Sequence, residues 1–248
     1  MLVKSQVKYI QSLGHKKFRD ADGVFVAEGP KIVKELLGSD NLRLVECYAT
    51  AAWLSANETE MNGKEKQLIR IQEKELERIS FQSTANQVLA IFTKPVFSNP
   101  PNPEGLTLLL DNIQDPGNMG TIIRTADWFG VKRIVCSPET TDAFSPKVTQ
   151  SAMGSLIRVE ILYADLENYI RSNRKTVLYA SSLEGEDLHE NIPVENAMLL
   201  MGNESRGISP LLGSLATKRI RIPASGAAES LNVAVATGIL LSRMTRVS

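Results

Sequence analysis

The stretch LTLLLDNIQDPGNMGTIIRTADWFG, residues 106–130, joins an apolar run, a polar loop and a second apolar segment. The first run, up to Ile113, is typical of a buried strand, and Pro116-Gly117 ends it with a turn. The segment after the turn predicts a helix that carries Arg124. Strand, loop and helix in this order are the repeating unit of an α/β fold, whose ligands bind beyond the carboxyl ends of the strands.

The same alternation continues to the carboxyl terminus. Near-continuous apolar strands separated by helical segments predict a parallel, Rossmann-like sheet that is covered on both faces. We expect its strands at residues 106–113, 133–137, 158–162, 176–181, 197–202 and 218–223, and an apolar closing helix within residues 229–244.

A break in composition precedes this region. Residues 94–105 contain four prolines, which can continue neither a helix nor a central strand. Before the break, short strands and helices also alternate, which predicts a smaller α/β domain. We therefore expect a domain at residues 1–94, a linker at 95–105 and a second domain at 106–248.

Composition narrows the classes of protein. The 28 basic and 28 acidic residues cancel, so no global basic signature indicates nucleic-acid binding, although the segment from Lys4 to Lys34 is locally basic. The two cysteines and two histidines lack metal-ligand spacing, and no apolar run approaches the ~20 residues of a membrane span. We expect a cytoplasmic protein with reduced thiols, no metal ion and no membrane contact.

Three polar loops that contain glycine follow predicted strands, at residues 111–120, 202–209 and 222–232. Neither the dinucleotide pattern G-x-G-x-x-G nor a P-loop is present, which disfavours a classical NAD or NTPase site. Asn118 precedes or caps the helix predicted after the first loop, and Arg124 lies just under two turns into it; the start of a helix favours an anion. The alternative is structural, with Asn118 capping the helix and Arg124 paired with Asp127 or Asp111.

Residues 108–131, 199–209 and 220–241, in this order, resemble the three motifs of the SpoU-type RNA ribose 2′-O-methyltransferases of the SPOUT superfamily. The segment HKKFRDADGVFVAEGPKIVKELL, residues 15–37, resembles the substrate-binding domain often fused ahead of that catalytic domain, a small fold related to RNA-binding ribosomal proteins. The resemblance spans nearly the whole chain. It implies a trefoil knot in the second domain and a homodimer.

The resemblance also implies the reaction, transfer of a methyl group from S-adenosylmethionine to a ribose 2′-hydroxyl. The implied catalytic residues are Asn118, Arg124, Glu204, Ser230 and Asn232. The implied cofactor-binding residues are Met201, Gly202, Asn203, Ile222, Pro223, Leu231 and Asn232. For RNA binding we expect Lys16, Lys17 and Arg19 in the first domain, together with Arg124.

The implied roles have structural alternatives. A guanidinium keeps its proton in proteins, so we interpret Arg124 as a group that positions phosphate and ribose rather than as a base. Glu204 could anchor Arg124 or contact substrate or cofactor, but a carboxylate at a helix start is also favoured by the helix dipole. Ser230 could be only an N-cap. Ala234 stands where many members of the family have serine.

The most direct interpretation is an enzyme that methylates structured RNA, with ribosomal RNA favoured by the fused first domain. A methyltransferase acting on transfer RNA is the alternative within the class. A non-catalytic RNA-binding or ribosome-assembly protein is the alternative outside it, and a small-molecule enzyme is weakened by the missing dinucleotide pattern.

Overall fold

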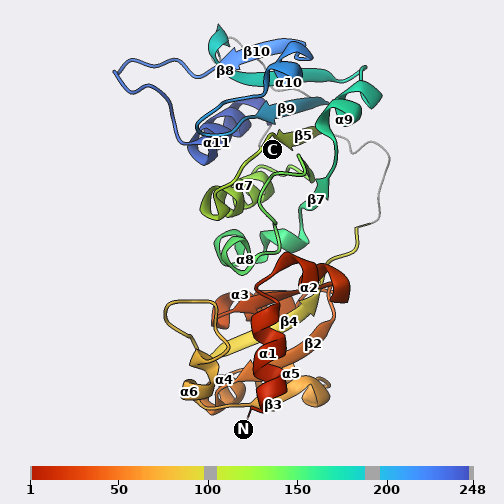
Figure 1. Ribbon diagram of the computed structural model, residues 1–248, viewed down its shortest axis with the longest axis vertical. Coiled ribbons are helices and arrows are strands. Elements are labelled where there is room, and N and C mark those ends of the chain that lie inside the picture. The colour runs from red at the N-terminus through yellow and green to blue at the C-terminus, as the bar shows by residue number, and fades with distance from the viewer. Residues whose placement is uncertain (1, 98–104, 188–195, 246–248) are drawn as a thin grey trace. The chain divides into compact units, whose positions relative to one another are not determined.

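The computed structural model describes residues 2–97, 105–187 and 196–245 (Figure 1). The chain forms two compact units. The first contains residues 1–98 together with 142–157, and the second contains residues 99–141 with 158–248. Most of the predicted linker, residues 98–104, lies outside the described residues, so the boundaries at 94 and 106 stay a prediction.

The first unit contains a four-stranded sheet in the order β1-β4-β2-β3. Its strands are β1 (Val24–Glu28), β2 (Leu44–Ala49), β3 (Leu68–Arg70) and β4 (Val88–Thr93). The last strand, β4, lies between β1 and β2 and is antiparallel to both, whereas β2 and β3 are parallel. Short strands alternating with helices were predicted for this region, but the central place of β4 depends on pairing between distant segments, which strand spacing does not reveal.

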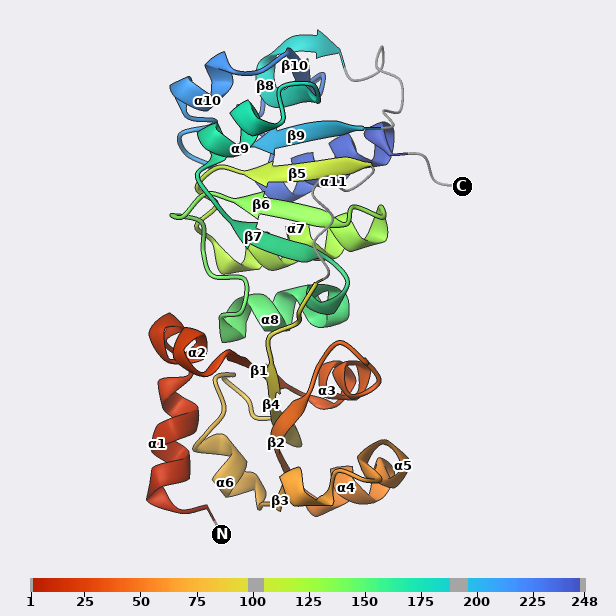
Figure 2. The same ribbon diagram turned by 90° about the vertical axis from the view of Figure 1, so that its right-hand side faces the viewer.

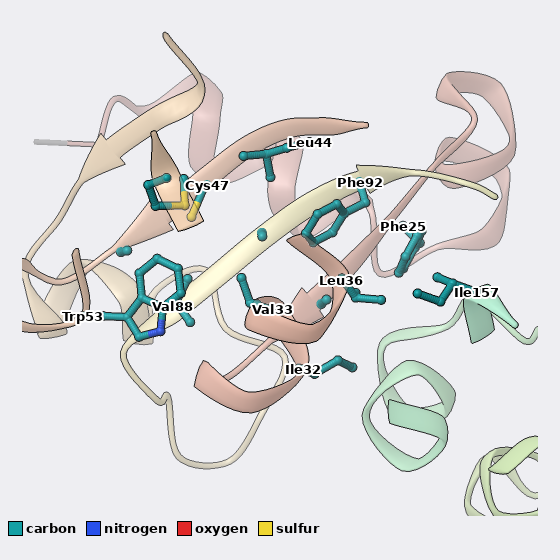
Figure 3. Packing of buried hydrophobic residues seen from close by; sticks show 14 residues of the cluster. Phe25, Ile32, Val33, Leu36, Leu44, Cys47, Trp53, Val88, Phe92 and Ile157 are labelled. Carbon is teal, nitrogen blue, oxygen red and sulfur yellow. The ribbon is translucent and has the colours of Figure 1, made fainter. Parts of the chain in front are cut away.

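Two apolar clusters cover the faces of this sheet because strand side chains alternate between them. Phe25, Cys47 and Phe92 point into one cluster, and Val26 and Tyr48 point into the other. Figure 3 shows the first cluster, in which Ile157 from the segment 142–157 packs with residues of the sheet. The first cluster also contains residues of α3 (Pro30–Leu37), α4 (Ala51–Ala56), α5 (Glu58–Met61) and the 3-10 helix η2 (Met153–Ile157). The second cluster also contains residues of α1 (Lys4–Ser12) and α6 (Glu73–Glu77).

Helix α3 illustrates how the local sequence sets an element. Gly29 adopts a φ of 94°, a backbone conformation that residues with a side chain rarely adopt. Pro30 is the first helical residue, a position at which the missing backbone N–H of proline costs no hydrogen bond within the helix. Ile32, Val33 and Leu36 then lie on one face at helical spacing and are buried. The first unit is completed by α2 (Lys16–Asp22), η1 (Glu65–Gln67) and α8 (Pro146–Ala152).

The second unit contains a six-stranded sheet in the order β10-β8-β9-β5-β6-β7, and each neighbouring pair is parallel. The strands are β5 (Leu106–Leu110), β6 (Arg133–Cys136), β7 (Glu160–Tyr163), β8 (Val177–Asp187), β9 (Ala197–Met201) and β10 (Lys218–Arg221). The predicted parallel α/β sheet is therefore confirmed. The trefoil knot stays a prediction from the resemblance.

Helices cover both faces of this sheet. In Figure 2, α7 (Pro116–Trp128) and α11 (Val233–Met244) lie behind the strands and α9 (Leu166–Ser172) lies in front. Leu109, Val135 and Leu200 form a buried cluster with residues of α9 and of α10 (Pro210–Ser214). Chain order reverses at β5, because β6 and β7 lie on one side of it and β9 lies on the other. This reversal is where open α/β sheets form ligand sites.

Candidate functional site

The loops after β5 and β9 lie side by side because these strands are paired, with Leu110 opposite Met201. Asp111 is 8% exposed, and its carboxylate accepts a hydrogen bond of 2.7 Å from the amide of Ser209. The carbonyl of Asn112 accepts a hydrogen bond of 2.8 Å from Nδ2 of Asn203. Hydrogen bonds thus join the first predicted loop to the second.

The start of α7 is held by Asp115. Its side chain accepts a hydrogen bond of 2.8 Å from the amide of Asn118, and Pro116 is the first helical residue. Asn118 therefore lies within the first turn, and the alternative that it caps the helix is wrong. Asp115 followed by Pro116 is a helix-start signal in the sequence, but it was not used to predict where this helix begins.

Asn118 joins the three loops. Its Nδ2 donates to Oε1 of Glu204 at 2.6 Å, and its Oδ1 accepts from Nδ2 of Asn232 at 2.9 Å. The structure thus brings together three of the five predicted catalytic residues, one from each loop. They form the cluster that we call the three-loop junction, consisting of Asn118, Glu204 and Asn232.

The hydrogen bonds of the three-loop junction have one consistent direction. A carboxylate can only accept, so Asn118 must present its amide nitrogen to Glu204 and its oxygen to Asn232. Asn232 then donates from its nitrogen, and its Oδ1 accepts from the amides of Ala234 at 3.0 Å and Val235 at 3.3 Å. The orientation of both amide groups is therefore set by the helix start and by the charge of Glu204.

Asn232 is the N-cap of α11. The structural alternative for Ser230, an N-cap at this helix, is therefore wrong. Ser230 is exposed and lies two residues before the cap. The structure does not bring it into the three-loop junction.

Arg124 is exposed on α7 and makes no ion pair or hydrogen bond within the described ranges. The predicted structural partners are engaged elsewhere, because Asp127 pairs with Arg158 at 2.8 Å and Asp111 accepts from Ser209. Glu204 contacts Asn118 rather than Arg124. The guanidinium of Arg124 is thus available to a ligand.

The second loop is a tight hairpin. The amide of Asn203 donates to the carbonyl of Gly207 at 3.0 Å, and the amide of Gly207 donates to the carbonyl of Asn203 at 2.9 Å. A Cβ on Gly202 would lie 2.3 Å from the carbonyl carbon of Gly207, so only glycine permits this close approach. Met201 and Gly202 are buried, which gives the loop a rigid base.

The third loop is different. Residues 222–231 make no backbone hydrogen bond to any part of the chain that the structure describes. Leu231 is 48% exposed, and Val235 at the start of α11 is 51% exposed. Backbone amides and carbonyls that have no partner among the described residues, beside exposed apolar side chains, suit a flat ligand with polar edges and apolar faces. An adenine ring has these properties.

The predicted RNA-binding residues of the first unit separate into two groups. Lys16 and Lys17 are exposed at the start of α2. Arg19 is 1% exposed, and its guanidinium donates to the carbonyl of Leu13 at 2.5 Å and to the carboxylate of Asp142. A phosphate cannot reach a side chain held in this way, so we leave Arg19 out of the proposed RNA surface.

The cysteines take no part in the three-loop junction. Cys47 and Cys136 are both buried, and burial raises the pKa of both thiols, to about 12 for Cys47. Across the described ranges, no cluster of three histidine, cysteine or acidic residues is placed to hold a metal ion. Nor is any described helix long and apolar enough to cross a membrane.

Comparison with known proteins matches residues 105–242 to the SpoU rRNA Methylase family. The chain belongs to this family. Residues 4–90 match the MRM3-like substrate binding domain. The predicted family and the predicted enzyme class, an RNA methyltransferase, are confirmed.

Relatives of this SpoU methylase extend over both units. The 23S rRNA (guanosine(2553)-2′-O)-methyltransferase RlmP of Bacillus subtilis is 31% identical over 95% of this chain and 94% of its own length. A putative RNA methyltransferase of the TrmH family from Porphyromonas gingivalis is 41% identical, with a TM-score of 0.85 over 98% of this chain and 97% of its own. An AdoMet-bound rRNA methyltransferase from Sinorhizobium meliloti is 33% identical, with a TM-score of 0.82 over 97% of this chain and 94% of its own.

Proposed function

We propose that this protein transfers a methyl group from S-adenosylmethionine to a ribose 2′-hydroxyl of ribosomal RNA. The three-loop junction is the observation that carries the proposal, because it brings residues from all three motifs to one end of the sheet. The RlmP relative is named for 2′-O-methylation of 23S rRNA, and it aligns over nearly the whole chain. The bacterial origin of the RlmP relative favours the cytoplasm as the proposed compartment.

The second and third loops would hold the cofactor, whose sulfonium supplies the methyl group. The hairpin that follows Met201 and Gly202 would form one wall, and the backbone of residues 222–231, which has no hydrogen bond to the described residues, would offer donors and acceptors to the adenine edge. The remaining proposed contacts are Asn203, Ile222, Pro223, Leu231 and Asn232. The 33% identical Sinorhizobium meliloti relative is an AdoMet-bound rRNA methyltransferase, which supports S-adenosylmethionine as the cofactor.

Arg124 would bind the RNA backbone. Its guanidinium is exposed, has no partner in the described residues and matches phosphate oxygens in geometry. Holding a phosphate beside the target nucleotide would keep the ribose hydroxyl in line with the methyl group, which is the main requirement for a poor nucleophile. Lys16 and Lys17 would contribute further phosphate contacts from the first unit.

Asn118 and Glu204 would position this reaction. Glu204 holds the amide of Asn118 in one orientation, and Asn118 in turn contacts the cap of α11. Ser230 lies in the exposed third loop, from which its hydroxyl would contact the substrate. We assign Ser230 this role by its motif position.

The second unit would form a homodimer through α7 and α11. Trp128 at the end of α7 is 84% exposed and Val235 on α11 is 51% exposed, although these helices pack against each other. Large apolar side chains that remain exposed on neighbouring helices are typical of a protein interface. Light scattering of the purified protein should give twice the chain mass, and Trp128→Glu should give the mass of one chain.

The function is tested by incubating the protein with ribosomal RNA or transfer RNA and a methyl-labelled donor. We expect the label in ribosomal RNA. The linkage that follows the labelled ribose should resist alkaline hydrolysis, as a 2′-O-methyl group requires. Label on transfer RNA alone would overturn the substrate class. Absence of label on both RNAs, with no cofactor binding by calorimetry, would favour a non-catalytic RNA-binding protein.

A further inference from the structure

Four consecutive residues at the start of α2, His15 to Phe18, are exposed. Phe18 is 40% exposed, whereas Phe25, Phe92 and Trp53 are at most 2% exposed. Among the described phenylalanine, tyrosine and tryptophan residues of the first unit, Phe18 is the only exposed one, and the others are buried or half-buried. Burial of an aromatic ring is favourable, so an exposed ring offers a face on which a flat ligand can stack.

The immediate surroundings of Phe18 are basic. Nζ of Lys17 lies 4.7 Å from the centroid of the Phe18 ring, and the ring of His15 lies 6.4 Å away, inclined at 63°. We call His15, Lys17 and Phe18 the Phe18 patch.

The acidic residues of α2 are engaged outside the Phe18 patch. Asp20 pairs with Lys94 at 2.5 Å, and Asp22 faces Tyr9, whose pKa is raised to about 12 by burial and by this carboxylate. Arg19 is turned inward onto Asp142. The segment from His15 to Phe18 at the start of α2 therefore combines an exposed aromatic ring with basic side chains, whereas the exposed carboxylates of α2 follow at Asp20 and Asp22.

We propose that the Phe18 patch binds an unpaired RNA base, which stacks on the Phe18 ring while Lys17 contacts a neighbouring phosphate. A base inside a duplex has both faces covered by its neighbours, so only an unpaired base offers a face to a protein ring. Lys17 has a flexible side chain that can leave the ring and reach a phosphate without losing its charge. This inference rests on the proposed function, because it names the part of the RNA that the first unit recognises.

RNA fits this surface better than a protein partner does. A protein interface has an apolar core with few charges, whereas Phe18 is flanked by Lys16, Lys17 and His15. Stacking on aromatic side chains next to basic residues is the usual way in which proteins hold single-stranded RNA.

The test measures binding of fluorescein-labelled RNA to the full-length protein by anisotropy, with a short single-stranded RNA and the blunt duplex formed with its complement. Phe18→Leu keeps apolar volume but removes the ring, and we expect it to weaken single-strand binding by roughly 5- to 100-fold. Duplex binding should stay within about twofold of the wild type. Phe18→Trp should restore or strengthen single-strand binding, because tryptophan offers a larger stacking face.

Val3→Ala is the matched control, since Val3 is an exposed apolar residue of the same unit, at 56%. It should leave both affinities unchanged, and thermal melting should show that all variants are folded. Equal binding of single-stranded RNA by Phe18→Leu and the wild type would overturn the proposal. So would an equal loss of single-strand and duplex binding.

A kinetic measurement separates this inference from the proposed function. If the protein methylates ribosomal RNA, Phe18→Leu should raise KM for the RNA and leave kcat unchanged, because no residue of the Phe18 patch belongs to the three-loop junction or to the proposed cofactor contacts. Methylation with an unchanged KM would overturn the inference alone. Single-strand binding that depends on Phe18, without any methyl transfer, would overturn the proposed function alone.

Discussion

Asn118 and Glu204 are 86 positions apart in the chain, yet Nδ2 of Asn118 donates to Oε1 of Glu204 at 2.6 Å. This contact exists because β5 and β9 pair in parallel, so that the loops after them begin at the same edge of the sheet. The carboxylate can only accept, so it selects one orientation of the amide. The pairing of β5 with β9 therefore determines, through this hydrogen bond, how the side chain of Asn118 is oriented in the proposed active site.

Replacing Asn118 by aspartate should disrupt the three-loop junction. Asn118→Asp places a second carboxylate against Glu204 and removes the donor between them, so we expect kcat/KM for methyl transfer to fall by about 100-fold. The double variant Asn118→Asp with Glu204→Gln restores a donor and an acceptor and should recover part of the lost activity and melting temperature. Losses that simply add in the double variant would contradict the hydrogen-bonded pair.

Removal of the Arg124 guanidinium should separate chemistry from cofactor binding. Arg124→Ala should lower methyl transfer by about 100-fold or more, because the ribose loses its positioning group. Affinity for S-adenosylmethionine, measured by calorimetry, should stay within about twofold. Arg124→Lys keeps the charge but not the planar fork and should recover only part of the activity. Near-native turnover by Arg124→Ala would show that the site assignment is wrong.

The ion pair between Arg19 and Asp142 should contribute to stability far more than an exposed pair. The side chains are 2% and 11% exposed, so Asp142→Asn leaves a buried positive charge without its partner and should cost about 3 kcal/mol of unfolding free energy. Asp20→Asn is the matched control, because the Asp20 side chain that pairs with Lys94 is 47% exposed and should cost less than about 1 kcal/mol. Guanidinium unfolding curves of both variants measure the difference. Similar midpoints for the two would contradict the structural role of the buried pair.

Glu28 should make stability depend on pH. It is 6% exposed and accepts hydrogen bonds from Oγ of Ser80 at 2.5 Å and the amide of Phe81 at 2.8 Å. Burial raises the pKa of this carboxyl above its usual 4.5, although the two hydrogen bonds oppose the shift.

Because the pKa of Glu28 is higher in the folded protein, the folded state binds the proton more tightly than the unfolded state does. The stabilisation is therefore complete below pH 4.5 and is lost as the pH rises through the raised pKa. Glu28→Gln removes this titration and should reduce the fall in melting temperature above pH 4.5. Parallel melting-temperature profiles of the variant and the wild type would contradict the assignment.

Much of the site could be predicted from the sequence because its residues lie in short, local patterns. The strand, turn and helix around Asn118 and Arg124 follow from apolar runs and Pro116-Gly117. The sequence resemblance grouped Asn118, Glu204 and Asn232, and the structure places these three in contact.

Other features could not be predicted, because they depend on which segments meet. Arg19 lies in a basic run and was expected at the RNA surface, but its partner Asp142 is 123 positions away. Ser230 has the residue type of an N-cap, yet α11 begins at Val233 and Asn232 caps it. The exposure of Phe18 likewise results from how α2 packs, since the same residue type is buried at Phe25.

The sequence by itself determined the elements, their α/β order and the three loops that carry polar groups, because hydrophobic periodicity and turn residues act over a few positions. Only the tertiary structure decided which strands are neighbours, and thereby which side chains meet. The pairing of β5 with β9 sets the contact between Asn118 and Glu204, and the packing of the segment 142–157 in the first unit buries Arg19. The physical reason is that burial and hydrogen bonding between distant segments depend on the whole packed core.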